Sequence, residues 1–171
     1  KEHNLEIQDW LEREMKIRVL GFPVRDKNIP HEASHPALKS TIEGSWPSYT
    51  YQERLEGAMT SMYETLQGSK DSRRAFWSLW RTEDSLRAKH PTRVPCSISY
   101  QAMIRNINGK DQLEFIYTMR SSDFDTFFVS DVWLANQFQN DLADTLGVKR
   151  GNFIHIISSL HSFKVNSQEI Y

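Results

Sequence analysis

The sequence contains a single cysteine, Cys96, so the chain cannot form an internal disulfide bond. One unpaired thiol fits a reducing compartment. The sequence also has no apolar run that approaches the roughly 18–20 residues of a membrane-spanning helix. The first residues, 1–4, lack the positive start and apolar stretch of a signal peptide. We therefore expect a cytoplasmic protein, or one of the host cytoplasm if the source is a virus.

An excess of either sign of charge is also missing. The 21 Lys and Arg residues nearly balance the 22 Asp and Glu residues, which leaves a net charge of −1. A protein that binds nucleic acid directly or lies on an anionic membrane usually carries a basic excess, so we expect neither partner. A local group of arginines can still bind a small anion. The length of 171 residues is typical of one domain, so we treat 1–171 as a single unit.

Hydrophobic spacing predicts helices and strands in irregular alternation. Helices are predicted over residues 5–19, 51–67 and 131–146, and strands over residues 75–80, 98–107, 113–120 and 153–163. The Asn108-Gly109 pair is a strong hairpin signal between two of these strands. Gly147 is typical of a helix end, and residues 21–47, rich in proline, are predicted to be irregular. Helices and strands mixed in this way indicate an α+β fold.

Polar groups that can carry chemistry follow one another along the chain. They are Asp71-Ser72-Arg73-Arg74, Pro95-Cys96, Arg120-Ser121-Ser122-Asp123 and, near the end of the last predicted strand, His161. Arginine presents a planar fork of donors that matches phosphate, and a serine hydroxyl can assist it. A nearby arginine would also favour the thiolate form of a cysteine, which is the nucleophilic form. These groups predict a pocket for a phosphomonoester beside a nucleophilic thiol.

Each of these residues also has a structural interpretation from local pattern alone. Cys96 can be an inert core residue, Arg73 and Arg74 a solvated pair, Arg120 an ion-pair anchor, Asp123 a turn cap, Asp131 a helix N-cap and His161 a core histidine. The order and the spacing of the groups decide between the two interpretations. Taken together, they resemble the thymidylate synthase and deoxycytidylate hydroxymethylase superfamily over about residues 49–166, including the stretch Tyr49-Thr50-Tyr51-Gln52-Glu53-Arg54-Leu55.

The resemblance implies a thymidylate synthase-like mixed sheet with flanking helices, packed through one face of the sheet in a homodimer. It also implies a role for each matching residue. Cys96 is the catalytic thiol, Arg120 contacts both phosphate and thiol, Ser121 contacts phosphate, Asp123 meets the folate, His161 meets the sugar hydroxyl, and Arg73 and Arg74 reach the phosphate of the neighbouring subunit's nucleotide. No metal is implied. The co-substrate would be 5,10-methylenetetrahydrofolate.

Asp131 departs from the thymidylate synthase pattern in an informative way. Thymidylate synthases carry asparagine at this position, and its amide pairs with N3–H and O4 of uracil. Cytosine presents an unprotonated N3 and an amino group at C4. A protonated carboxylic acid can donate to that N3 and accept from that amine, and a mismatched partner would leave buried polar groups unsatisfied. Asp131 therefore favours cytosine and the hydroxymethylase branch.

The sequence predicts that Cys96 adds to C6 of a cytidine monophosphate nucleotide, dCMP or CMP, so that C5 becomes nucleophilic and accepts a hydroxymethyl group. Two alternatives stay open. One is a thymidylate synthase that methylates dUMP. The other is a non-catalytic, nucleotide-binding homologue or a fragment, a view that the unplaced N-terminal glutamate of the family and the C-terminal segment missing after Tyr171 support. The tryptophan near that glutamate is not placed either. Trp46, Glu43 and Glu32 are candidates by residue type only.

Overall fold

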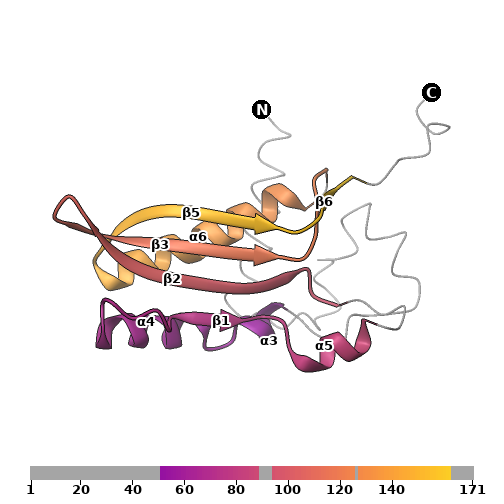
Figure 1. Cartoon of the computed structure of the whole chain (residues 1–171), viewed down its shortest axis with the longest axis horizontal. Helices are drawn as coiled ribbons and strands as arrows, with labels where there is room; N and C mark the ends of the chain where they lie inside the picture. The colour runs from indigo at the N-terminus through magenta and orange to yellow at the C-terminus, as the bar shows by residue number, and fades with distance from the viewer. Residues whose placement is uncertain (1–50, 89–93, 126, 163–171) are drawn as a thin grey trace, which may run out of the picture.

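The computed structural model describes residues 51–88, 94–125 and 127–162. The predicted helix at 5–19 and the irregular stretch at 21–47 lie outside the described residues. The helices are α3 (Tyr51–Leu55), α4 (Ala58–Gly68), α5 (Thr82–Arg87) and α6 (Phe128–Leu146), and the strands are β1 (Phe76–Ser78), β2 (Ser97–Ile107), β3 (Lys110–Met119), β4 (Ser122–Asp123), β5 (Lys149–Ile157) and β6 (Leu160–His161) (Figure 1).

Four strands form a mixed sheet in the order β1-β2-β3-β5. The pairs β1–β2 and β2–β3 are antiparallel, whereas β3 and β5 are parallel. The long helix α6 provides the crossover between β3 and β5, which is the usual device for joining parallel neighbours. Strands β4 and β6 form a separate parallel pair just beyond the ends of β3 and β5. This arrangement confirms the predicted α+β class with a mixed sheet and flanking helices.

The core lies between one face of the sheet and the helices α4 and α6. The predicted inward faces of two strands are confirmed, because the side chains at alternate positions of β2 and β3 are buried. They are Tyr100, Ala102 and Ile104 on β2, and Leu113, Phe115, Tyr117 and Met119 on β3. From the helices, Met62, Leu66, Phe138 and Leu142 join the same cluster. The hairpin between β2 and β3 turns at Asn108 and Gly109, both with positive φ, as the sequence predicted.

The single helix predicted over residues 51–67 is wrong, because the chain breaks it in two. Gly57, with φ 77°, adopts a left-handed conformation between α3 and α4. Glycine reaches this region without steric cost, so the break occurs where the sequence offers one. The break lets α3 take a direction of its own, and α3 carries Tyr51 toward the start of β2.

The last predicted helix begins earlier than expected. It starts at Phe128 rather than Asp131, and its N-cap position is Phe127, whose side chain makes no capping hydrogen bond. The interpretation of Asp131 as a helix N-cap is therefore wrong. Asp131 lies within the first turn, where a carboxylate interacts favourably with the helix dipole. The end of the helix is as predicted, with Gly147 in a left-handed conformation (φ 67°).

The single strand predicted over residues 153–163 is also wrong. The structure has β5 over Lys149–Ile157 and then, after a bend, the short strand β6 at Leu160–His161. The bend lies at Ser158 and Ser159, which the predicted strand included between its apolar residues. The bend moves His161 out of the large sheet and places it opposite Asp123 in the β4–β6 pair.

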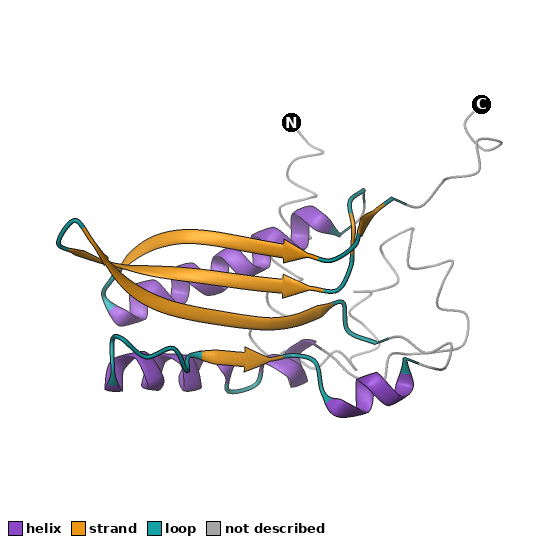
Figure 2. Cartoon of the chain, viewed as in Figure 1, coloured by secondary structure: helices purple, strands orange, loops and turns teal. Residues whose placement is uncertain are grey.

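The second face of the sheet carries exposed apolar side chains and is left uncovered by the helices that the structure describes (Figure 2). Phe76, Ile154 and Ile156 are 50%, 44% and 49% exposed. In the sheet register, Gln101 and Ile116 join Phe76 and Ile154 in one row. We call this surface the open face. None of the described helices combines the length and the apolar character that crossing a bilayer requires.

Candidate active site

Cys96 lies immediately before β2, and the end of β3 brings Arg120 to it. The backbone N–H of Arg120 donates to the carbonyl oxygen of Cys96 at 2.9 Å. This bond extends the antiparallel pairing of β2 and β3 beyond its last ladder position. Two motifs that are 24 residues apart in the sequence therefore meet at one end of the sheet.

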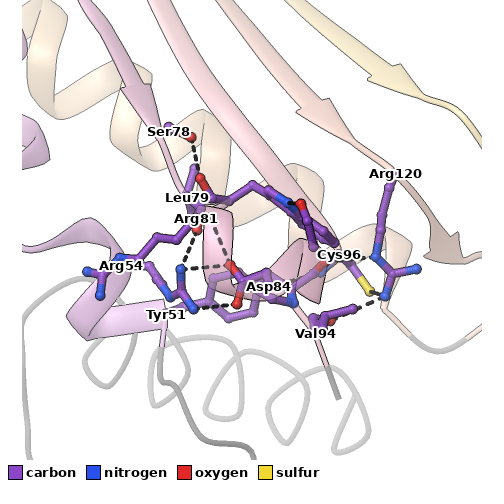
Figure 3. Close-up of polar contacts among 12 residues, drawn as sticks. Tyr51, Arg54, Ser78, Leu79, Arg81, Asp84, Val94, Cys96 and Arg120 are labelled. Atoms are coloured by element: carbon purple, nitrogen blue, oxygen red, sulfur yellow. Dashed lines mark hydrogen bonds and ion pairs between the residues drawn. The ribbon is translucent and has the colours of Figure 1, made fainter. Parts of the chain in front are cut away.

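The guanidinium of Arg120 lies beside the thiol (Figure 3). Its Nε donates to the Pro95 carbonyl at 2.8 Å and one terminal nitrogen donates to the Val94 carbonyl at 3.2 Å. The same terminal nitrogen lies 3.7 Å from Sγ of Cys96, and the Ser121 hydroxyl lies 3.6 Å from the same sulfur. The other terminal nitrogen donates to Ser121 at 3.1 Å and has a second hydrogen, which is available to an anion. Thiol, hydroxyl and guanidinium are thus held within contact distance of one another.

Tyr51 fixes the backbone at the thiol from the opposite side. Its hydroxyl oxygen accepts hydrogen bonds from the backbone N–H groups of Cys96 (3.1 Å) and Ser97 (3.3 Å). The helix that carries Tyr51 is anchored by a buried, two-fold ion pair in which Arg54 donates to both carboxylate oxygens of Asp84 at 2.7 and 2.8 Å (Figure 3). Such fork-to-fork pairs have defined geometry as well as strength. Cys96 is therefore held on a rigid support rather than on a free loop.

Asp131 reaches the β4 strand from the first turn of α6. It is 8% exposed, and the hydroxyl of Ser122, itself 2% exposed, donates to its Oδ2 at 3.2 Å. Tyr117 lies nearby and shares a hydrogen bond with Ser97, the residue after the thiol. Burial raises the pKa of Tyr117 well above its ordinary value, and the carboxyl of Asp131 raises it further. The phenol therefore stays neutral at physiological pH.

Asp123 and His161 lie opposite one another in the β4–β6 pair. Asp123 is 8% exposed and its Oδ1 accepts the backbone N–H of Asp125 at 3.2 Å. Its Oδ2 accepts no hydrogen bond that the structure records. His161 is partly buried. Asp123 follows the end of β3 and His161 follows the end of β5, and these two strands are parallel. Both residues therefore lie at the end of the sheet where β2 begins after Cys96.

Arg73 and Arg74 are not brought to Cys96 within the chain. Both are exposed. They precede Ala75, whose carbonyl accepts the N–H of Ala102 at 2.8 Å. Since Ala102 is six residues along from Cys96 and a strand rises about 3.3 Å per residue, this part of the chain lies about 20 Å from the thiol. An arginine side chain does not span that distance, so these two residues cannot complete the site of their own chain.

A separate groove lies at the opposite end of the sheet. Its volume is about 510 Å³, and it is bounded by the ends of α4 and α6 and by the β2–β3 hairpin, with Lys70, Lys110 and Lys149 at its edge. None of the predicted site residues lines it. The groove is therefore not part of the site around Cys96.

Three residues near the site were missed by sequence reasoning. Tyr51 was quoted only as part of a matching stretch, and Ser122 occupies the variable position of the Arg-Ser-x-Asp motif, so neither gave a signal of its own. The third, His155, lies in β5, where its ring stacks on Tyr117 (4.7 Å between centroids, 5° between planes) and Phe128 (6.0 Å, 10°). Both ring nitrogens are buried and have no hydrogen-bond partner among the described residues. The candidates Trp46, Glu43 and Glu32 lie outside the described residues.

We expect His155→Phe to stabilise the protein and to reduce its sensitivity to acid. Burial lowers the pKa of His155, so the unfolded chain binds a proton below about pH 6.5 that the folded chain resists. The free energy of unfolding of the wild type should therefore fall as the pH drops through 6.5. Phenylalanine keeps the stack and removes the two unsatisfied nitrogens, which should add about 1 kcal/mol. Urea unfolding at pH 7.5 and 5.5 measures both effects. An equal acid sensitivity in the two proteins would contradict the prediction.

Comparison with known proteins identifies the fold and the family. Residues 8–170 match the family described as thymidylate synthase. Among solved structures, thermostable thymidylate synthase A from Bacillus subtilis is similar, with a TM-score of 0.51 and 23% sequence identity over 61% of this chain. The match covers 35% of that protein, so the chain spans about a third of its length. At this identity the structural likeness concerns the fold alone. No protein of curated function matches the sequence.

The order of the motifs, the mixed sheet and the meeting of Cys96 with Arg120 agree with the family match, which covers nearly the whole sequence. The chain therefore belongs to the thymidylate synthase family.

Proposed function

We propose that the protein transfers a one-carbon unit to C5 of a cytidine monophosphate nucleotide, dCMP or CMP, and releases the 5-hydroxymethyl product. The observation that supports this most directly is the contact of Cys96 with both Arg120 and Ser121, with Asp131 buried at the same end of the sheet. A nucleophile beside a phosphate-binding pair is the minimum that such a reaction needs.

Each step of the proposed mechanism uses a group with a suitable environment. Cys96 thiolate adds to C6 of the pyrimidine, which turns C5 from a poor nucleophile into a good one. Arg120 donates to the sulfur through one terminal nitrogen, and the remaining N–H of the other terminal nitrogen, with the Ser121 hydroxyl, binds the nucleotide phosphate. Asp131, in its neutral form, donates to N3 and accepts from the amino group at C4. His161 binds a sugar hydroxyl.

The co-substrate 5,10-methylenetetrahydrofolate would supply the one-carbon unit as a methylene group when bound, and tetrahydrofolate would leave. Water would supply the hydroxyl group of the product, C5 would lose its proton, and the Cys96 thiolate would be expelled from C6. The chain offers a residue that fits this ligand, because Oδ2 of Asp123 accepts no recorded hydrogen bond and a carboxylate is a suitable acceptor for the N–H groups of a pterin ring. Asp123 follows Arg120 and Ser121 on the same strand connection. It would therefore orient the folate beside the nucleotide.

The active form would be a homodimer packed through the open face. Phe76, Ile154 and Ile156 are each about half exposed, and exposed apolar side chains on one face of a sheet can mark an interface. A second copy of the chain is the favoured occupant because Arg73 and Arg74 lie too far from their own Cys96. A two-fold axis through the open face would let each protomer offer these arginines to the other.

The experiment that tests the function measures release of tritium from C5 of dCMP, CMP or dUMP in the presence of the folate. Release from a cytidine nucleotide but not from dUMP supports the proposal. Release from dUMP with formation of dihydrofolate favours a thymidylate synthase. Binding of nucleotide without any release favours a non-catalytic homologue.

We expect Asp131→Asn to shift the preference from the cytidine nucleotide towards dUMP. The amide pairs with N3–H and O4 of uracil when its oxygen faces N3, whereas cytosine needs the NH2 group in that place. In the uracil-pairing orientation of the amide, kcat/KM for the cytidine nucleotide should fall on the order of 100-fold. The value for dUMP should rise. The matched control is Asp125→Asn, which removes an exposed carboxylate from the neighbouring turn and should leave the preference unchanged. An unchanged preference in Asp131→Asn would mean that this residue does not read the base.

A further inference from the structure

The contact between Ser122 and Asp131 joins two buried groups whose backbones are fixed. Ser122 lies in β4, and its N–H donates to the Ser159 carbonyl at 3.0 Å. Asp131 lies in the first turn of α6, and its N–H donates to the Phe127 carbonyl at 2.9 Å. The contact therefore joins two side chains whose backbones are held in place. The Ser122 hydroxyl, at 3.2 Å from Oδ2, acts directly on the orientation of the Asp131 carboxyl group.

A neutral carboxyl group has two unlike oxygens, and a base can distinguish them. One oxygen carries the proton and donates, while the other only accepts. A hydroxyl that donates to Oδ2 favours Oδ2 as the accepting oxygen, so the proton is placed on Oδ1. Cytosine needs this division, because its N3 accepts and its C4 amine donates.

The geometry points to Ser122 as a specificity-determining positioning residue, which sets the Asp131 carboxyl so that Oδ1 donates to N3 of cytosine and Oδ2 accepts from the C4 amine. This inference rests on the proposed function. Ser122 touches neither substrate nor folate in this scheme and acts through Asp131. Ser122 occupies the variable position of the Arg-Ser-x-Asp motif, which thereby has a role.

The hydroxyl groups around the pair support a role for the Ser122 hydroxyl in orienting Asp131. The nearby Tyr117 remains a neutral phenol, and its hydroxyl is engaged with Ser97. Ser122 donates its hydroxyl hydrogen to Oδ2 of Asp131. Removing the Ser122 hydroxyl should therefore remove this donor to Oδ2 and with it the preference for Oδ2 as the accepting oxygen.

The test compares Ser122→Ala with Ser130→Ala, using the full chain. Ser130 is also 2% exposed and lies in the same first turn of α6, but its hydroxyl donates to the Phe127 carbonyl. Dissociation constants for dCMP, CMP and dUMP are measured by calorimetry, and kcat/KM by tritium release. We expect Ser122→Ala to lower affinity and kcat/KM for the cytidine nucleotide about tenfold, as the loss of one such hydrogen bond predicts, with values for dUMP unchanged. Ser130→Ala should change the affinities for both bases equally or not at all.

If Ser122 had a purely structural role, Ser122→Ala would weaken the binding of the cytidine nucleotides and of dUMP alike. That result would overturn the inference. Ser122→Thr, which keeps the hydroxyl, should retain the preference for cytosine. A variant of normal thermal stability that has lost this preference would also contradict the inference. In an Asp131→Asn background, Ser122→Ala should no longer alter the ratio between the two bases, since the acid that Ser122 orients is gone. Failure of the proposed function is distinguishable, because the wild type itself would then show no preference for cytosine.

Discussion

Cys96→Ser is expected to abolish tritium release from dCMP and CMP, with a loss of at least about 1000-fold, while nucleotide affinity stays within a few-fold of wild type. A serine hydroxyl at this position has no adjacent general base among the recorded contacts, whose donors are the Arg120 guanidinium and the Ser121 hydroxyl. Those donors suit a thiolate and cannot remove a proton from an alcohol. The nucleotide would still contact the residues that bind its phosphate and its base. The variant should therefore lose tritium release and keep its affinity for the nucleotide.

Steady-state kinetics and equilibrium dialysis measure the two quantities. The matched control is Ser99→Ala on the same strand, a buried residue without a predicted role, which should keep both activity and affinity. Activity within tenfold of wild type in Cys96→Ser would show that the sulfur forms no bond to the ring. Equal loss of affinity and activity would instead indicate that Cys96 supports the shape of the pocket.

The local features of the fold were predictable from the sequence because they depend on neighbouring residues. The Asn108-Gly109 turn is specified by two residues that accept positive φ, and it sets the antiparallel register of β2 and β3. Strict alternation then decides which faces of these strands are buried, as at Phe115 and Tyr117. Gly147 ends α6 for an equally local reason.

The features that the sequence did not predict arise from contacts between distant segments. Parallel pairing of β5 with β3 depends on how α6 crosses the sheet, which no local pattern encodes. The break between α3 and α4 is at Gly57, a single residue that a helix tolerates at moderate cost. The helical spacing of apolar residues therefore continues on both sides of it. The bend that separates β6 from β5 occurs at Ser158 and Ser159, between apolar residues, and it brings His161 opposite Asp123.

The site shows the same division. The order of the motifs predicted that Cys96 and Arg120 would meet, and they do. The support from Tyr51 connects residues 45 positions apart, and the Ser122–Asp131 contact depends on where α6 begins, three residues before the predicted start. The roles proposed for Arg73, Arg74, Asp123, Ser121 and His161 remain predictions.

The second large effect is expected when two inactive variants are combined. One chain carries Cys96→Ala with both arginines intact, and the other carries Arg73→Ala and Arg74→Ala with Cys96 intact. Each homodimer should be nearly inactive, because every site lacks either the thiol or the partner's arginines. In a heterodimer, the intact Cys96 of one chain meets the intact arginines of the other, so one of the two sites is complete. Random association makes half of the dimers heterodimers, and about a quarter of wild-type activity should return.

Co-expression with two affinity tags, followed by tandem purification, isolates the mixed dimer, whose specific activity should approach half that of the wild type, since one site of two is complete. The charge-matched control replaces Lys110 and Lys149, exposed lysines at the hairpin end of the sheet, and should not reduce activity in any combination. A mixed dimer as inactive as its parents would mean that the arginines act within their own chain or not at all. The separation of about 20 Å along β2 between Cys96 and Ala102, which pairs with the residue after Arg74, makes action within one chain the less favourable outcome. Recovery of activity would therefore establish both the dimer and the shared phosphate site in one measurement.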